Sequence, residues 1–184
     1  MKPETEERVK PSLGKITQVA FMTRDIRASI DHFVDHLGIG PWFMIAGGGF
    51  AQTRCRGVPC SPQLTTAFAN ARGMEFELMQ LDNDEPCMWR DALARPFARE
   101  AFHHWCHWPD DYDATLAAAL AQGYRVYQDG ATARGRFVYL EHPGSPDDIL
   151  ELTERTPARR AFQELVAEAG RDWDGTTRIV ADPA

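Results

Sequence analysis

The feature that most constrains the fold of this chain is an approximate internal repeat. Gln18 and His104 each open a short apolar run that ends near an aspartate and leads into a stretch with helical periodicity. When Gln18 is aligned with His104, an offset of 86 residues (104 minus 18), Asp25 falls on Asp111. This offset is close to half of the 184 residues. The repeat therefore indicates two copies of one strand–helix–strands module that share a core.

Hydrophobic periodicity predicts the same order of elements in both copies. In the first copy we expect the strand 16–22, the helix 26–37 with Asp25 as its N-cap, and the strands 41–45, 63–70 and 74–81. In the second copy we expect the strand 103–108, the helix 113–122, and the strands 124–128, 136–141 and 149–153, with turns at 129–130 and 143–146. An amphipathic helix is predicted over 158–169, and residues 50–62 carry no assignable pattern.

This order of elements predicts an α+β fold with eight strands in two βαβββ modules, followed by a C-terminal helix. We expect a flexible tail at residues 1–14 and a single domain at 15–155. Within that domain, module one spans 15–81, a linker spans 82–101 and module two spans 102–155. The C-terminal helix and a polar tail occupy 156–184.

Composition narrows the classes of partner. Hydrophobic residues make up 43% of the chain and charged residues 26%, as in ordinary globular proteins. The net charge of −7 argues against nucleic acid as a partner, and no apolar run is long enough to span a membrane. We expect a cytoplasmic protein with four free thiols, because the cysteines form no CxxC pair and the N-terminus lacks a signal-peptide core. The open sheet edges of such modules favour a homodimer.

Four polar residues lie in apolar strands at matching places of the two copies: Gln18, His104, Glu77 and Glu151. Each has an ordinary explanation when taken alone, such as a hydrogen-bonded core histidine for His104 or an ion pair between Glu151 and Arg136. A carboxylate buried without a partner is costly, however, and a shared divalent metal would offset that cost. One imidazole, two carboxylates and an amide oxygen suit Zn, Ni, Co, Mn or Fe(II). Their joint placement therefore favours a metal site.

Several stretches of the chain resemble the vicinal oxygen chelate superfamily, which holds glyoxalase I, methylmalonyl-CoA epimerase, extradiol dioxygenases and bleomycin-resistance proteins. The stretches are 18–21 leading to 25–26, 37–41, 76–79, 103–106 leading to 111, and 150–152. The resemblance implies a cup-shaped eight-stranded sheet around a metal held by four side chains, namely Gln18, Glu77, His104 and Glu151. This set is similar to that of one branch of glyoxalase I. Epimerases and many dioxygenases usually have a histidine where Gln18 stands, although the Leu-Gly-Ile-Gly-Pro-Trp-Phe run and the double histidine are nearer the epimerase-like branch.

The function that this resemblance implies is that of a metal-dependent lyase, isomerase or epimerase of the glyoxalase type. It would act on a small molecule with vicinal oxygens through an enediolate or enolate, with Glu151 or Glu77 carrying the proton. A non-catalytic small-molecule-binding protein of the bleomycin-resistance type and a ring-cleaving dioxygenase remain alternatives. Five aromatic residues are expected to contact the substrate, with core packing as the ordinary explanation for each: Phe21, Trp42, Phe43, Phe137 and Tyr139.

Strand alternation refines this expectation for the histidine-rich segment. If Gln18 and His104 face the cup, then Cys106 and Trp108 also point inward, whereas Trp105 and His107 point away. The alternation thus argues against His107 as a catalytic residue.

Overall fold

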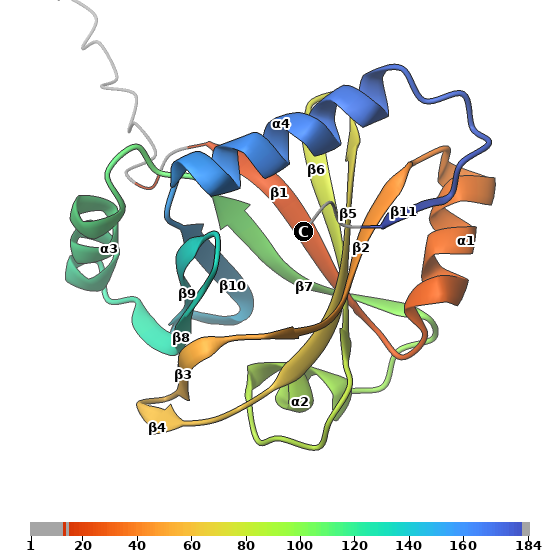
Figure 1. Ribbon diagram of the computed structural model, residues 1–184. Helices are drawn as coiled ribbons and strands as arrows, with labels where there is room; N and C mark the ends of the chain where they lie inside the picture. The colour runs from red at the N-terminus through yellow and green to blue at the C-terminus, as the bar shows by residue number, and fades with distance from the viewer. Residues whose placement is uncertain (1–12, 14, 182–184) are drawn as a thin grey trace, which may run out of the picture.

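The computed structural model describes residues 13 and 15–181, which form one curled, unclosed sheet and four helices (Figure 1). The sheet has eleven strands in the order β11-β2-β5-β6-β1-β7-β10-β9-β8-β3-β4. The strands are β1 (Ile16–Thr23), β2 (Trp42–Gly49), β3 (Ala51–Cys55), β4 (Val58–Pro59), β5 (Gln63–Ala71), β6 (Met74–Leu81), β7 (Glu100–His107), β8 (Arg125–Thr132), β9 (Gly135–His142), β10 (Ser145–Thr153) and β11 (Ile179–Ala181). The helices are α1 (Ile26–Leu37), α2 (Met88–Leu93), α3 (Tyr112–Ala121) and α4 (Pro157–Arg171).

The α+β fold with two βαβββ modules is confirmed. Module one contributes β1, α1, β2, β5 and β6, and module two contributes β7, α3, β8, β9 and β10. The cap of α1 forms as expected, because the Asp25 carboxylate accepts hydrogen bonds from the backbone N–H groups of Arg27 and Ala28. Gly38 ends the helix with a φ of 63°, a left-handed conformation that glycine adopts without strain.

The register of the sheet confirms the repeat. The first strands of the modules, β1 and β7, pair antiparallel at the centre of the sheet, with Gln18 opposite Cys106 and Ala20 opposite His104. The 86-residue offset exchanges these two pairs, since it relates Gln18 to His104 and Ala20 to Cys106. Equivalent pairings occur one strand further out, where Ala20 faces Glu77 on β6 and Cys106 faces Glu151 on β10, although Glu77 and Glu151 are 74 residues apart (151 minus 77). The two modules are therefore related by a pseudo-twofold axis between β1 and β7.

Two parts of the sheet differ from the sequence prediction. The turn predicted at residues 129–130 is wrong: β8 continues to Thr132, and the turn falls at residues 133–134. A Cβ on Gly130 would lie 2.7 Å from the ring of Phe137, so this glycine permits close packing inside a strand. The unassigned residues 50–62 form β3 and β4, and β3 pairs with β8, so that module one extends the edge of module two.

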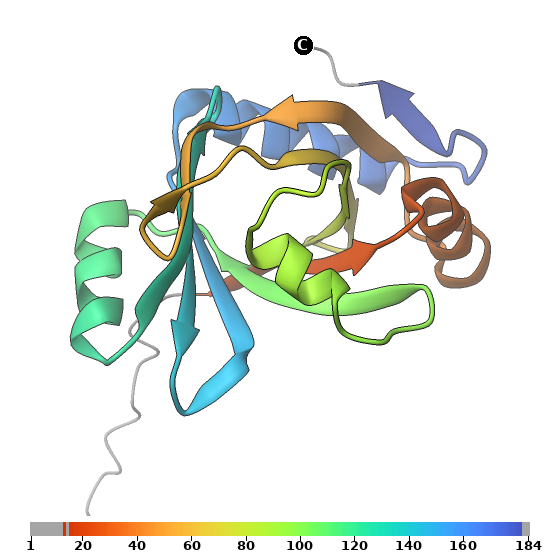
Figure 2. The same ribbon diagram turned by 90° about the horizontal axis from the view of Figure 1, so that it is seen from below.

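The helices cover different faces of the sheet. On the outer face, α1 packs over module one around Phe33, Trp42 and Leu78, and α3 packs over module two around Leu140 and Leu152. On the concave side, α4 runs across the curl in Figure 1, and α2 lies within the curl when the molecule is seen from below in Figure 2. The inner face of the sheet is therefore enclosed between these two helices.

The remaining predictions about the ends of the chain are tested only in part. Apart from Leu13, the tail predicted for residues 1–14 lies outside the described residues. The predicted C-terminal helix is present as α4, and its N-cap is Thr156. Within the described part of the chain, no helix combines the length and apolar character that a membrane crossing requires.

Candidate metal centre

The inner face of the four central strands carries polar side chains in two adjacent rows. One row runs Glu75–Gln18–Cys106–Glu151 across β6, β1, β7 and β10. The next row holds Glu77 and His104, separated by the small side chain of Ala20. Because side chains alternate along each strand, the apolar neighbours of these residues point outward and support α1 and α3. The sheet register alone thus gathers three carboxyl groups and an imidazole at the bottom of the curl.

Three of these residues, Glu77, His104 and Glu151, form a group that could hold a metal ion. One potential ligand atom from each lies within 4.8 Å of the others, and all three residues are buried. The Nε2 atom of His104 lies 3.1 Å from an oxygen of Glu151 and 3.6 Å from an oxygen of Glu77. Ligand-to-metal distances of about 2.0–2.2 Å are compatible with ligand atoms at such separations.

The hydrogen bonding of His104 supports this interpretation. Its Nε2 atom is buried and has no hydrogen-bond partner among the described residues, although an oxygen of Glu151 lies 3.1 Å away. A buried polar atom without a partner is uncommon in a native interior. A cation between the imidazole and the two carboxylates would satisfy all three groups, so the residues present fit a divalent metal.

The electrostatic environment gives the buried carboxyl groups different pKa values. Burial, together with the negative charges of Glu151 and Glu75, raises the pKa of Glu77 well above its usual value. Burial also raises the pKa of Glu75, to about 8. Burial acts in the same direction on Glu151, but the contact with His104 and the positive charge of Arg159 outweigh it, and the pKa of Glu151 is lowered. Glu151 is therefore the carboxyl group that most readily ionises in this cluster.

Gln18 lies beside this group and contacts Glu75. Its side-chain Nε2 donates a hydrogen bond of 2.9 Å to Oε1 of Glu75. Under the pseudo-twofold symmetry, Gln18 occupies the position equivalent to His104, as the sequence predicted. In the structure, however, its side chain is hydrogen-bonded to Glu75. Its role as a fourth metal ligand stays a prediction.

A β-bulge on β7 adds a second histidine to the inner face. The register with β1 shifts between Ala20 and Phe21, which pair with His104 and Phe102, so His103 is the extra residue. His103 is buried, and its Nδ1 lies 2.9 Å from the Nδ1 of His104. Burial, with the neighbouring His104, holds the pKa of His103 well below its usual value, so its ring is neutral. His103 is thus placed to orient the imidazole of His104.

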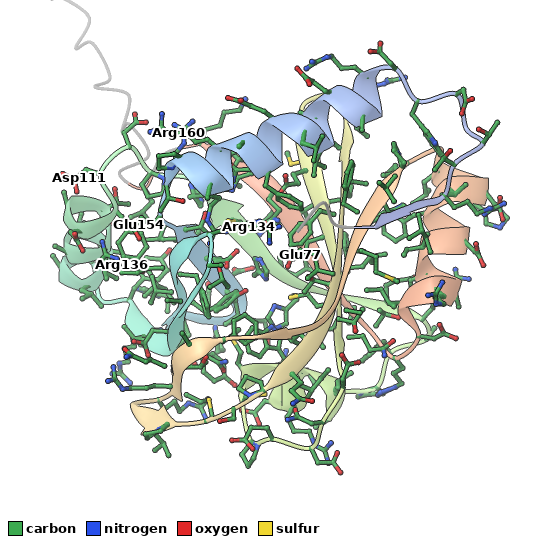
Figure 3. All side chains as sticks on the ribbon, viewed as in Figure 1. Glu77, Asp111, Arg134, Arg136, Glu154 and Arg160 are labelled. Atoms are coloured by element: carbon green, nitrogen blue, oxygen red, sulfur yellow. The ribbon has the colours of Figure 1, made fainter. Side chains whose placement is uncertain are left out.

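The two carboxyl groups, Glu77 and Glu151, lie on the wall of a cavity of about 220 Å³, and His104 is fully buried behind them. Seven aromatic side chains line the cavity: Phe50, Phe68, Trp89, Trp108, Phe137, Tyr139 and Phe162. The polar lining comes from Gln18, Glu75, Glu77, Glu151, Thr66, Thr132, Thr153, Arg134, Arg159 and Gln163. Figure 3 shows Glu77 and Arg134 on the concave side of the sheet beneath α4. Aromatic walls around an acidic floor describe a site for a small, partly apolar molecule.

The aromatic residues predicted to contact a substrate fall into two groups. Phe137 and Tyr139 line the cavity. Trp42 is fully buried on the outer face, where its indole N–H donates to the carbonyl of Ile39, and Phe21 packs in the same outer cluster. Phe43 packs beneath α4 against Phe162. The last three residues do not line the cavity, so we leave them out of the proposed site.

The inward and outward assignments along β7 agree with strand alternation. Cys106 is buried beside Glu151, and Trp108, just beyond the strand, lines the cavity. Trp105 is 38% exposed on the other face, and His107 does not line the cavity.

Sequence reasoning missed several residues around the site, among them Glu75, Trp89, His103, Arg159 and Gln163. Glu75 shares a strand face with Glu77, and that signal was present in the sequence. Arg159 and Gln163 lie four residues apart and so share one face of α4, but nothing in the sequence shows that this face covers the cavity. The position of His103 depends on the bulge, and that of Trp89 depends on the packing of α2.

A curled sheet of paired βαβββ modules with a possible metal site on its inner face defines the general class of this protein. The family model described as the glyoxalase/bleomycin resistance protein/dioxygenase superfamily matches residues 17–139, and the chain belongs to this family. No curated protein matches the sequence significantly.

Solved structures with the same fold are distant in sequence. Methylmalonyl-CoA epimerase from Mycobacterium tuberculosis is 16% identical, with a TM-score of 0.56 over 84% of this chain and 97% of that one. A hypothetical protein from Bacillus halodurans C-125 is 16% identical, with a TM-score of 0.58 over 77% and 94% of the two chains. A Streptomyces coelicolor methylmalonyl-CoA epimerase variant in complex with 2-nitronate-propionyl-CoA is 18% identical, with a TM-score of 0.51 over 78% and 99%. At these identities the comparisons show the fold alone.

Proposed function

We propose that this protein is a metal-dependent isomerase, epimerase or lyase that acts on a small molecule with vicinal oxygen atoms. The observation that carries the proposal is the buried Glu77–His104–Glu151 group, whose two carboxyl groups line the aromatic cavity. These three residues would hold the metal, with Gln18 as the candidate fourth ligand. A divalent ion bound there would supply Lewis-acid polarisation of a substrate oxygen.

The side chains around the group have distinct tasks in this proposal. The aromatic walls exclude water, which strengthens every charge interaction inside the cavity. Glu77 and Glu151 remain candidates for moving a proton to or from the substrate carbon. Glu75 is a further candidate, because it lines the same cavity but lies outside the metal group. A carboxyl group that is not needed as a ligand can exchange a proton without loss of the metal.

The donor set favours this class over oxygen chemistry. A ring-cleaving iron dioxygenase commonly uses two histidines and one carboxylate, whereas this group has one histidine and two carboxylates. Two carboxylates and one imidazole suit zinc, manganese, nickel or cobalt as Lewis acids.

Metal content by elemental analysis tests the first half of the proposal, on protein purified without a metal-affinity tag. We expect about one first-row metal per chain in the wild type and its loss in His104→Ala, with Trp105→Leu on the outer face as the matched control. Absence of metal in the wild type after incubation with Zn²⁺, Mn²⁺, Co²⁺ and Ni²⁺ would refute the proposal and leave a non-catalytic binding protein.

Proton chemistry is tested separately with the metal-loaded protein in D₂O. Loss of the C–H signal next to a carbonyl is followed by NMR for a panel of 2-hydroxy ketones, 2-oxo aldehyde adducts of thiols, and methylmalonyl-CoA. Exchange in the wild type that is abolished in Glu75→Gln, with metal retained, would identify Glu75 as the proton carrier. Oxygen uptake with catechols and no exchange with any of these compounds would favour the dioxygenase instead.

A further inference from the structure

Helix α4 places an arginine on the wall of the cavity that lies across from the sheet. Arg159 and Gln163 both line the cavity, and the helix is fixed to the sheet by Phe162, which packs against Phe43 and Phe68. The metal group lies on the sheet itself. A molecule in the cavity therefore meets the carboxyl groups of the sheet from one side and the α4 side chains from the other.

Arg159 has donors that the protein leaves unused. Its Nε is buried and has no hydrogen-bond partner among the described residues. Its Nη2 makes only a long contact, of 3.5 Å, to the carbonyl oxygen of Gly135. No carboxylate of the described chain lies within ion-pair distance of its guanidinium, although its charge is felt by Glu75, Glu77 and Glu151. An arginine that faces a cavity with free donors is suited to receive a planar anion.

The second arginine on the lining differs from Arg159 in its surroundings. The guanidinium of Arg134 lies 4.3 Å from the ring centre of Phe162, in a cation–π contact. Arg134 is therefore held against the underside of α4, where it adds positive charge to the same end of the cavity.

The charges of the lining are consistent with an anionic ligand. Three carboxyl groups and two guanidinium groups face the cavity, which leaves one negative charge when all are ionised. A divalent ion at the metal group makes the net charge of the lining positive, whether or not all three carboxyl groups are ionised, and this favours an anionic ligand.

Building on the proposed function, we infer that the substrate carries a carboxylate that is separate from its vicinal oxygens and that Arg159, assisted by Gln163, receives this carboxylate. The walls between the two ends are aromatic and the cavity measures about 220 Å³. This size and lining select a compact acid with an apolar or aromatic body. The C-terminal helix thus determines specificity.

A matched pair of probes tests the inference. 3,4-Dihydroxybenzoate has vicinal oxygens at one end and a carboxylate at the other, and 4-methylcatechol replaces that carboxylate by a methyl group. Binding of both to the zinc-loaded full chain is measured by isothermal titration calorimetry. We expect the wild type to bind the acid at least tenfold more tightly than the methyl compound, since a guanidinium–carboxylate pair is bidentate and charge-assisted.

Variants on α4 assign the preference to a residue. Arg159→Gln should reduce the ratio of the affinity for the acid to the affinity for the methyl compound to about one. Arg159→Lys should restore part of this preference. Arg160→Gln is the control, because Arg160 is exposed, is bound to the carbonyl of Arg155 and does not line the cavity (Figure 3). It should keep the wild-type preference. Circular dichroism and thermal unfolding confirm that each variant is folded.

The outcomes separate this inference from the proposed function. A wild-type protein that binds zinc but shows no preference for the acid overturns the inference and leaves the proposed function standing. So does an Arg159→Gln variant that keeps the preference and changes only its zinc affinity, since Arg159 would then merely balance the buried carboxylates. If the wild type binds none of Zn²⁺, Mn²⁺, Co²⁺ and Ni²⁺, the proposed function fails, and the same pair of probes on the metal-free protein still decides whether Arg159 receives the carboxylate.

Discussion

Replacing His103 should weaken metal binding although His103 is not one of the candidate ligands. The Nδ1 atoms of His103 and His104 lie 2.9 Å apart in the interior, so one of them must carry the proton that joins them. If His104 offers Nε2 to a metal, its proton sits on Nδ1, and the neutral ring of His103 accepts it. His103→Leu removes this acceptor and leaves a buried N–H without a partner.

The expected magnitude follows from that lost contact. Partners that orient a metal-bound histidine typically contribute about 10–100-fold in metal affinity, which corresponds to about 1.4–2.7 kcal/mol. In the metal-free protein, a buried donor left without its acceptor costs about 1–3 kcal/mol of folding stability. His103→Asn should restore most of the metal affinity and most of the folding stability. The side-chain oxygen of asparagine is an acceptor and lies two bonds from Cβ, as Nδ1 of histidine does.

The assay is competition for Zn²⁺ against a chromophoric chelator, combined with urea unfolding of the metal-free variants. Trp105→Leu on the outer face of the same strand is the control and should leave zinc affinity unchanged. The reasoning would be refuted by a His103→Leu variant with wild-type zinc affinity and stability, or by an Asn variant that is no better than Leu.

Three further predictions concern other parts of the molecule. Glu151→Gln should abolish metal binding and turnover while the circular dichroism spectrum stays native; a loss of folding would instead assign Glu151 a structural role. Gly170→Ala should destabilise the protein by about 1–3 kcal/mol in urea unfolding, because the added Cβ would overlap the backbone carbonyl of Asn70, whereas the exposed Glu168→Ala should change stability little. The Cys60 thiol, whose pKa burial raises to about 11, should be alkylated slowly at pH 8 and faster as the pH rises toward 11, as measured by mass spectrometry of the labelled peptide. A titration midpoint near 8.5 for Cys60 in the folded protein would contradict the expected effect of burial on this thiol.

Much of the fold was predictable because the repeat is encoded in local pattern. The helix bounds of α1 follow from the carboxylate of Asp25 and the left-handed Gly38, and both act within a few residues of themselves. The course of β8 was not predictable in this way. Asp129-Gly130 has the composition of a turn, but the ring of Phe137 on the next strand requires a glycine at position 130 for packing. A contact between strands thus overrode a local turn signal.

The metal group was predictable for a related reason. Glu77, His104 and Glu151 face inward because side chains alternate around Glu77 on β6, around Glu151 on β10, and along β7 from His104 to Cys106, and the register between strands preserves the symmetry of the repeat. Trp42 shows the limit of the same reasoning. Its place after Gly40-Pro41 suggested substrate contact, but the strand turns its indole toward α1, where it packs against Phe33.

The residues that sequence reasoning could not place are those that depend on departures from the repeat. His103 and His104 are adjacent, so regular alternation would put them on opposite faces, and only the bulge brings both to the inner side. Arg159 lies outside both modules, and its position depends on how α4 packs across the sheet. The repeat therefore supplies the candidate ligands, whereas the bulge and the added helix supply the groups that orient one ligand and complete the cavity.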